Sequence, residues 1–382
     1  MIIKQKKLLS SATAVFLAVS LAAGSVYADA EQTQMQTQAQ AQAAHYKLSL
    51  KDAIDMAIKD NPQITAFETE QKSNKINLDA AYKNMNRYKK ADVHSTNYSV
   101  MFVKKGYYVH SYEAAIRLND KNLEKIKSNI SYNVTQSYFN YKIADSLCGI
   151  AQNAYNLAKE NYDNVSKRFE LGMIAELDLK GAGLNVTQCE NTLNSYIRTR
   201  DIAKENLKIN LQLDGTDCDF ELTDSIECKD FSAALKDDTE KAMTSRYDVN
   251  ALNENYLLAK EYFEIAKPLS ESSATYQSAY SDYINKEYSY TNGKKQIALS
   301  LNNTYNSCLT AKDSLNTAQT SADIAKQTYD INKVKFGSGM ITNTELTKSL
   351  NDYLNANISL ENAKLTYKLA VEKYGYEISI GL

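Results

Sequence analysis

The sequence predicts a mainly α-helical protein made of long antiparallel, coiled-coil-like helical hairpins. The chain has only two prolines and twelve glycines in 382 residues, so few positions break a helix. Apolar side chains recur at steps of three and four over long stretches, which is the spacing of one helix face. Residues 167–174 (KRFELGMI) are followed 167 residues later by the similar residues 334–341 (VKFGSGMI). The similarity continues without a gap over roughly 65 positions and predicts an internal duplication.

Residues 1–30 have the features of a secretory signal peptide. Three lysines precede an apolar stretch, and a small-residue cleavage motif follows at residues 28–30. The apolar stretch is shorter than the ~20 residues that a membrane-spanning helix needs, which favours cleavage over an uncleaved anchor. Residues 31–45 are a leader rich in Gln and Ala, which we expect to be disordered or loosely helical because it has no apolar face to bury.

Residues 46–213 are predicted to form the first repeat. Ser49 stands before the first periodic apolar run, where a helix N-cap is expected, and Pro62 should start or kink the next helix. One helix is predicted over residues 112–169, which contain no proline, and a return helix over residues 176–213. The tight turn between them carries the duplicated motif.

Residues 214–234 are predicted to be a linker, and residues 235–382 the second repeat. The linker contains a glycine, several Asp residues and two of the five cysteines. Cys218 and Cys228 are close enough in sequence to form a disulfide, and two separate thiols are the alternative. An odd number of cysteines cannot all pair within the chain.

No catalytic, cofactor or metal site is predicted. The three histidines, His45, His94 and His110, lie far apart and outside any metalloprotease motif. Residues 337–339 read GSG, but the Lys-Ser/Thr of a phosphate-binding loop does not follow. Removing the predicted signal changes the formal charge from −2 to (44 − 3) − (46 − 1) = −4, which gives no electrostatic case for nucleic acid. The sequence therefore indicates a protein that is not an enzyme.

Four segments in order resemble the TolC-type outer membrane efflux proteins, over almost the whole mature chain. Residues 48–64 (LSLKDAIDMAIKDNPQI) are similar to that family's first helix motif, and residues 246–251 (RYDVNA) to its second-repeat equivalent. Residues 168–179 (RFELGMIAELDL) and 335–346 (KFGSGMITNTEL) resemble the two helical hairpin tips.

The resemblance implies a homotrimer whose long helices form a duct. A periplasmic adaptor, or membrane fusion protein, and an inner-membrane pump would dock at the hairpin tips. The adaptor-contacting residues implied by position are Leu171, Gly172, Met173, Ser338, Gly339 and Met340. Glu345 takes the position of a tip constriction in some family members, although an acid in the first turn of a helix is also favoured by the helix dipole.

The sequence departs from the family where a membrane barrel would be expected. A barrel strand needs ~9 to 11 residues with alternating apolar side chains. Residues 98–103 and 107–110 predict at most one short β-hairpin, and residues 268–293 carry tyrosines at helical spacing. The barrel is therefore expected to be reduced or absent.

Two functions follow from these observations. The first is transmembrane transport, as an efflux or export duct of the cell envelope that docks a partner through its tips. The alternative is a barrel-less exported helical protein with a structural or interaction role in the envelope. Family resemblance implies the outer membrane, whereas a missing barrel would fit a wall-associated or secreted protein.

Overall fold

The computed structural model describes residues 44–382, apart from residue 60, residues 91–97 and residues 228–229. Residues His45–Leu382 form one compact unit. The predicted signal peptide and nearly all of the predicted leader lie outside the described residues.

The described residues are mainly helical, which confirms the predicted fold class. In chain order the elements of the first half are β1 (Ala44–Leu48), α1 (Leu50–Ile58), α2 (Pro62–Lys90), α3 (Tyr98–Lys105), α4 (Tyr107–Glu170), α5 (Glu176–Asn210) and β2 (Cys218–Leu222). Those of the second half are α6 (Leu235–Ser245), α7 (Tyr247–Ala266), α8 (Ala274–Gly337) and α9 (Asn343–Glu377). Helices α4 and α8 both have 64 residues, and α5 and α9 both have 35.

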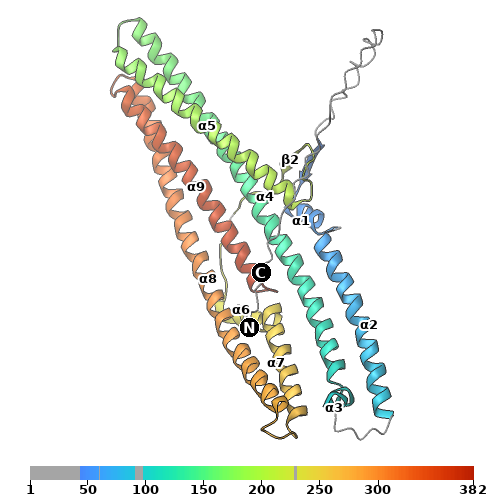
Figure 1. The fold of residues 1–382 in the computed structure, drawn as a ribbon. Coiled ribbons are helices and arrows are strands. Elements are labelled where there is room, and N and C mark those ends of the chain that lie inside the picture. Colours follow the sequence, from blue (N-terminus) through green and yellow to red (C-terminus); the bar gives the residue numbers. More distant parts are fainter. Residues whose placement is uncertain (1–43, 60, 91–97, 228–229) are drawn as a thin grey trace, which may run out of the picture. The chain divides into compact units, whose positions relative to one another are not determined.

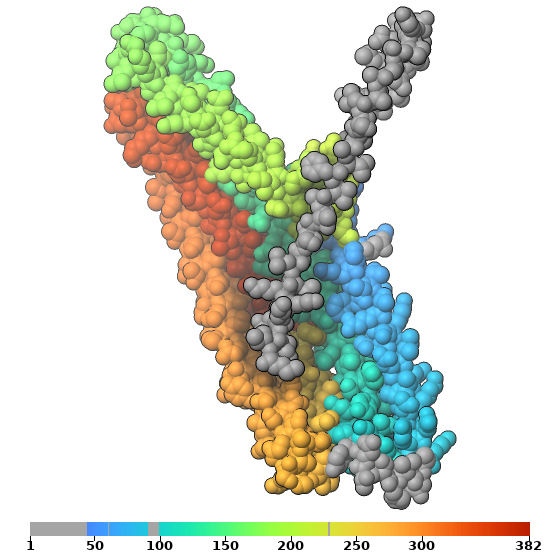
Figure 2. All heavy atoms as spheres, in the orientation of Figure 1, coloured from blue at the N-terminus to red at the C-terminus, as the bar shows by residue number. Residues whose placement is uncertain are grey.

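Two long hairpins, α4–α5 and α8–α9, dominate the unit (Figure 1). Helix α4 packs against α5 within its own hairpin and against α9 of the other, so the helices follow the order α5, α4, α9, α8. Toward the other end of the hairpins, α2 packs on α4, and α7 packs on both α4 and α8. Figure 2 shows the second hairpin, in orange and red, lying alongside the green first hairpin.

The largest core cluster lies where α1, α4, α5 and β2 meet. Val134, Tyr138 and Phe139 of α4 are almost fully buried there against Leu207 and Leu211 at the end of α5. Because several elements bury apolar area at this one place, it holds the beginning of the described chain, the first hairpin and the predicted linker together.

The first helix begins as the sequence predicts. Ser49 caps α1, because its hydroxyl oxygen accepts a hydrogen bond from the backbone N–H of Asp52 while the Asp52 carboxylate accepts one from the backbone N–H of Ser49. Pro62 is the first residue of α2, where its missing N–H leaves no helical hydrogen bond unmade.

A short sheet replaces parts of the predicted leader and linker. Strands β1 and β2 pair as a two-stranded parallel sheet, so His45 belongs to a strand and the linker contains residues 218–222 in extended form. The two paired strands are more than 160 residues apart in sequence, so no local sequence pattern predicted the sheet. Cys218 is a buried free thiol, and Cys228 lies outside the described residues.

Residues 98–110, where at most a short β-hairpin was expected, form no hairpin, because the structure makes them helical on both sides of Gly106. Helix α3 ends at Lys105, Gly106 adopts a φ of +88°, and α4 starts at the next residue. Phe102 is buried and stacks on Tyr262 of α7 with ring centroids 4.4 Å apart. The periodicity of a short apolar run does not distinguish a strand from a buried helix. Here the segment is helical, and its Phe102 side chain packs on α7.

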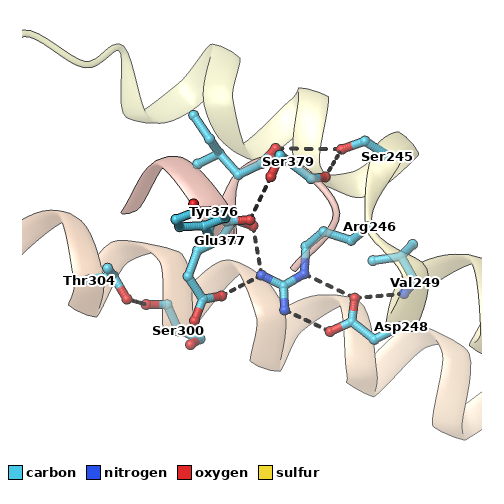
Figure 3. A network of polar contacts seen from close by, with 10 residues as sticks. Ser245, Arg246, Asp248, Val249, Ser300, Thr304, Tyr376, Glu377 and Ser379 are labelled. Carbon is cyan, nitrogen blue, oxygen red and sulfur yellow. Dashed lines mark hydrogen bonds and ion pairs between the residues drawn. The ribbon is translucent and has the colours of Figure 1, made fainter. Parts of the chain in front are cut away.

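A buried ion network joins the start of the second half to the C-terminus (Figure 3). The Arg246 guanidinium donates to both carboxylate oxygens of Asp248, at 3.0 and 2.8 Å, and to the carboxylate and the backbone carbonyl of Glu377. Tyr247 donates its backbone N–H to the carbonyl oxygen of Ile380 at 3.0 Å. The residues that end α9 are therefore held against the first turn of α7.

Within the described part of the chain, no helix combines the length and the apolar character needed to cross a membrane.

Candidate docking site at the hairpin tips

Both hairpin tips are built from the same turn. After α4, Gly172 donates its N–H to the Phe169 carbonyl oxygen at 2.8 Å, and Met173 donates to that of Arg168 at 2.9 Å. This pattern of hydrogen bonds is the Schellman motif, in which the residue after the helix cap must be left-handed. Gly172 meets this requirement with a φ of +69°.

The second tip repeats the geometry. Gly339 has a φ of +73° and donates to the Phe336 carbonyl oxygen at 3.0 Å, and Met340 donates to that of Lys335 at 2.8 Å. Both glycines thus hold their turns in the left-handed conformation. An added Cβ would meet no atom within 4 Å at either glycine, so the backbone conformation alone requires glycine there.

Large apolar side chains stand exposed on both turns. Leu171 is 74% exposed, Met173 is 69% exposed, and Met340 is 75% exposed. Single exposed apolar residues are ordinary, but these three occupy the turns at one end of paired hairpins. Methionine adapts its shape readily to a partner surface. The tips can thus offer apolar contact area without unfolding any element.

The two tips lie side by side and are joined by direct contacts. The Arg168 guanidinium lies over the Phe336 ring, 4.6 Å from its centroid, as a cation–π contact. Asn161 of α4 donates to the side-chain oxygen of Asn343 at the start of α9, at 2.8 Å. Residues of α4 and α8, together with Leu346 of α9, line a groove of about 400 Å³ beside these contacts. A partner at the tips would meet both turns and this groove as one surface.

Glu345 has a clear local role as a helix cap. Its carboxylate accepts hydrogen bonds from the backbone N–H of Thr342 at 2.8 Å and from the Thr342 hydroxyl at 2.9 Å, which completes a capping box for α9. These hydrogen bonds, the backbone one first, lower the pKa of Glu345. The first tip lacks this device, because Ala175 stands at the N-cap of α5. A constriction at Glu345 stays a prediction.

The structure brings all six predicted tip residues to one end, with Ser338 at the C-cap of α8 and Leu171 at that of α4. Sequence reasoning missed the Arg168–Phe336 contact and the Asn161–Asn343 hydrogen bond. Arg168 and Phe336 both belong to the duplicated motif. Only the packing of one hairpin on the other brings their side chains together.

Replacing Gly172 or Gly339 with Val is expected to lower the free energy of unfolding by about 1–2 kcal/mol each, because an L-residue is strained at positive φ. Gly181 is the control, since it lies within α5, does not have a positive φ, and has no neighbour within 4 Å of an added Cβ. Chemical denaturation of the three variants measures the difference. Equal stability of the Gly172→Val and Gly181→Val variants would contradict the strain argument.

No family model matches the sequence, and no curated protein matches it. Solved structures match over 87% of this chain. A membrane protein from Pseudomonas aeruginosa has a TM-score of 0.70 at 10% identity, with 90% of its chain covered. The CmeC outer membrane channel of Campylobacter jejuni has a TM-score of 0.61 at 15% identity, with 86% covered. The MtrE outer membrane channel of Neisseria gonorrhoeae has a TM-score of 0.65 at 12% identity, with 89% covered. At these identities the likeness shows the fold alone, which is that of TolC-type outer membrane channels.

Proposed function

We propose that this protein is a non-enzymatic efflux or export component of the cell envelope. Three copies would form a helical duct that docks an adaptor or pump at its hairpin tips. The fold likeness to outer membrane channels supports a duct. The observation that carries docking is the exposure of Leu171, Met173 and Met340 on two adjacent turns of identical geometry.

The same proposal covers the organisation of the chain. Residues 1–30 would direct export, and residues 31–45 would link the signal to the folded unit. Residues 46–213 and 235–382 would be two copies of one ancestral unit, joined by residues 214–234. The equal lengths of α4 and α8, and of α5 and α9, support this duplication.

A triple variant in which Leu171, Met173 and Met340 are each replaced by Asp is expected to lose partner capture and export while keeping the fold intact. All three side chains are exposed, so the substitutions cost little folding energy, but they place three carboxylates where a partner would bury apolar area. The measurement is photo-crosslinking in the native host from a benzophenone amino acid at residue 177, followed by mass spectrometry, in wild type and triple variant.

The expected crosslinked product contains a periplasmic adaptor or an inner-membrane pump, and it is lost in the triple variant. Leu257→Asp is the matched control, because Leu257 is an exposed apolar residue of α7, a helix that does not form the tips. Retention of the product in the triple variant, or its loss in the Leu257→Asp control, would contradict docking through the tips.

A further inference from the structure

Charged and neutral polar side chains occupy different sides of α5. At 100° per residue, the eight charged residues between positions 180 and 210 fall within about 160° of arc. A stripe about 60° wide on the other side of the helix carries amides and hydroxyls. Its polar members are Gln188, Thr192, Ser195, Thr199, Asn206 and Asn210. This side of α5 is therefore polar without being charged.

Helix α4 shows the same separation. Its six charged residues between positions 120 and 142 fall within about 160° of arc. A row of amides about 60° wide lies outside that arc and consists of Asn122, Asn129, Asn133, Gln136 and Asn140. The charged sides face the predicted linker, because Lys142 donates to the Leu222 carbonyl oxygen at 2.8 Å. Lys204 of α5 likewise pairs with Asp219 at 2.5 Å. The amides thus lie on the face of the hairpin that is turned away from the linker.

The two rows of amides line one groove of about 570 Å³ between α4, α5 and α9. The amides that line it are Asn133, Gln136, Asn140, Asn206, Asn210 and Asn362. Aliphatic side chains also line it, including Ile143, Leu147, Ile202 and Leu365. Among the described residues that line the groove, none is charged and none is aromatic. Residues 133–147 of α4 extend about 21 Å, which is the length of about six residues of extended peptide.

The chemistry of this lining matches a peptide main chain. A side-chain amide has both a donor and an acceptor, as does a peptide group. Neighbouring groups orient two of these amides: Gln136 donates to the Tyr132 hydroxyl at 3.0 Å, and Asn210 donates to the Asn206 backbone carbonyl oxygen at 3.0 Å. A charged ligand would find no opposite charge in the groove, so its desolvation would not be offset. A sugar ring would find no aromatic side chain on which to stack.

We infer that this groove binds an extended, uncharged peptide segment. The N–H and C=O groups of the segment pair with the amides of α4 and α5, and its aliphatic side chains pack on Ile143, Leu147 and Ile202. Asn140 and Asn206 come from the two helices and are both exposed, so they are the amides to test. The inference goes beyond the proposed function, because the groove lies within one copy and does not require a duct.

Isothermal titration calorimetry of the mature protein with short peptides tests the ligand class. The probe is an octapeptide with both ends blocked, in which glutamine alternates with alanine or leucine. We expect it to bind at least about tenfold more tightly than the same peptide with glutamate or lysine in place of glutamine. N-methylation of alternate main-chain nitrogens should weaken binding by a similar factor, because it removes the donors that the amides accept.

Two double variants test the site. Asn140→Leu/Asn206→Leu should bind the neutral octapeptide at least about tenfold more weakly, because it removes one amide from each side of the groove. Asn153→Leu/Asn194→Leu is the matched control and should bind as wild type does. Asn153 and Asn194 are exposed amides of the same two helices, and both lie on the charged sides. Asn140→Asp/Asn206→Asp should reverse the preference in favour of the lysine peptide.

Several results would overturn the inference. They are no binding of the neutral octapeptide, equal binding of its N-methylated form, and an equal loss of binding in the two leucine variants. Binding of maltoheptaose in place of the octapeptide would also overturn it, because the groove would then recognise neutral sugars. Partner capture at the hairpin tips is measured separately, so each of these results leaves the proposed function standing.

Discussion

Replacing Arg246 with Met is expected to lower the free energy of unfolding by about 3–5 kcal/mol, because it leaves the carboxylate of Glu377 buried without its cation. The Arg246 and Glu377 side chains are only 7% and 12% exposed. The substitution also removes the donors to Asp248 and to the backbone carbonyl of Glu377. Since these bonds hold the end of α9 against α7, the loss should appear first as fraying of the C-terminal residues.

Chemical denaturation and hydrogen exchange of residues 374–382 measure the two parts of this effect. The Arg246→Met/Glu377→Met variant should be more stable than Arg246→Met alone, because it removes the uncompensated charge as well. Lys348→Met is the matched control: Lys348 forms an exposed ion pair with Asp352, and such pairs contribute at most about 1 kcal/mol. A loss in Arg246→Met no larger than in Lys348→Met would show that the network does not stabilise the fold.

The long helices and their tips could be predicted because their signals are local. The absence of proline and the regular apolar spacing extend across α4, and the structure lengthens the predicted helix by only a few residues. Gly172 and Gly339 indicated the positions of the turns, because a glycine after a long helical pattern is typical of a left-handed cap. Ser49 and Pro62 likewise marked the starts of α1 and α2 from sequence alone.

The features that sequence reasoning missed depend on contacts between distant segments. Strand β1 pairs with β2, and the whole first hairpin separates the two strands in sequence. Each strand alone is too short to show a clear alternation of apolar and polar residues. Phe102 lies in a helix and stacks on Tyr262, which is 160 residues away in sequence. Arg246 was part of a recognised motif, but its partner Glu377 sits at the end of α9.

The candidate site likewise has features with local sequence signals and features that depend on contacts between distant segments. The position of the turns and the residues on them follow from one short motif, so the sequence predicted them. The pairing of the two tips through Arg168 and Phe336 needed the hairpins to be placed side by side. The Glu345 capping box could have been read from Thr342 three residues earlier, which is the spacing of that motif.

Tyr138 joins three segments through its hydroxyl, and removing that group is the second large effect we expect. The oxygen lies 3.0 Å from the Leu48 carbonyl oxygen and 3.1 Å from Asp224 Oδ2, and it accepts the backbone N–H of Asp224 at 3.1 Å. The side chain has no exposed surface. Tyr138→Phe should therefore lower the free energy of unfolding by about 1–3 kcal/mol at neutral pH, because buried polar groups lose their partner.

The size of this loss should depend on pH in a defined direction. Burial, together with the neighbouring Asp224 carboxylate, raises the pKa of Tyr138 to about 12, above the value of about 10 expected in the unfolded chain. A pKa raised by folding means that the hydroxyl stabilises fully below pH 10 and that this stability is lost as the pH rises from 10 to 12. Two pKa units correspond to about 2.7 kcal/mol, so the advantage of wild type over Tyr138→Phe should shrink toward zero over that interval. Denaturant midpoints of both proteins at pH 8, 10 and 12 measure the difference, in which the titration of all other groups cancels. A constant difference across the three pH values would mean that folding does not raise the pKa of Tyr138.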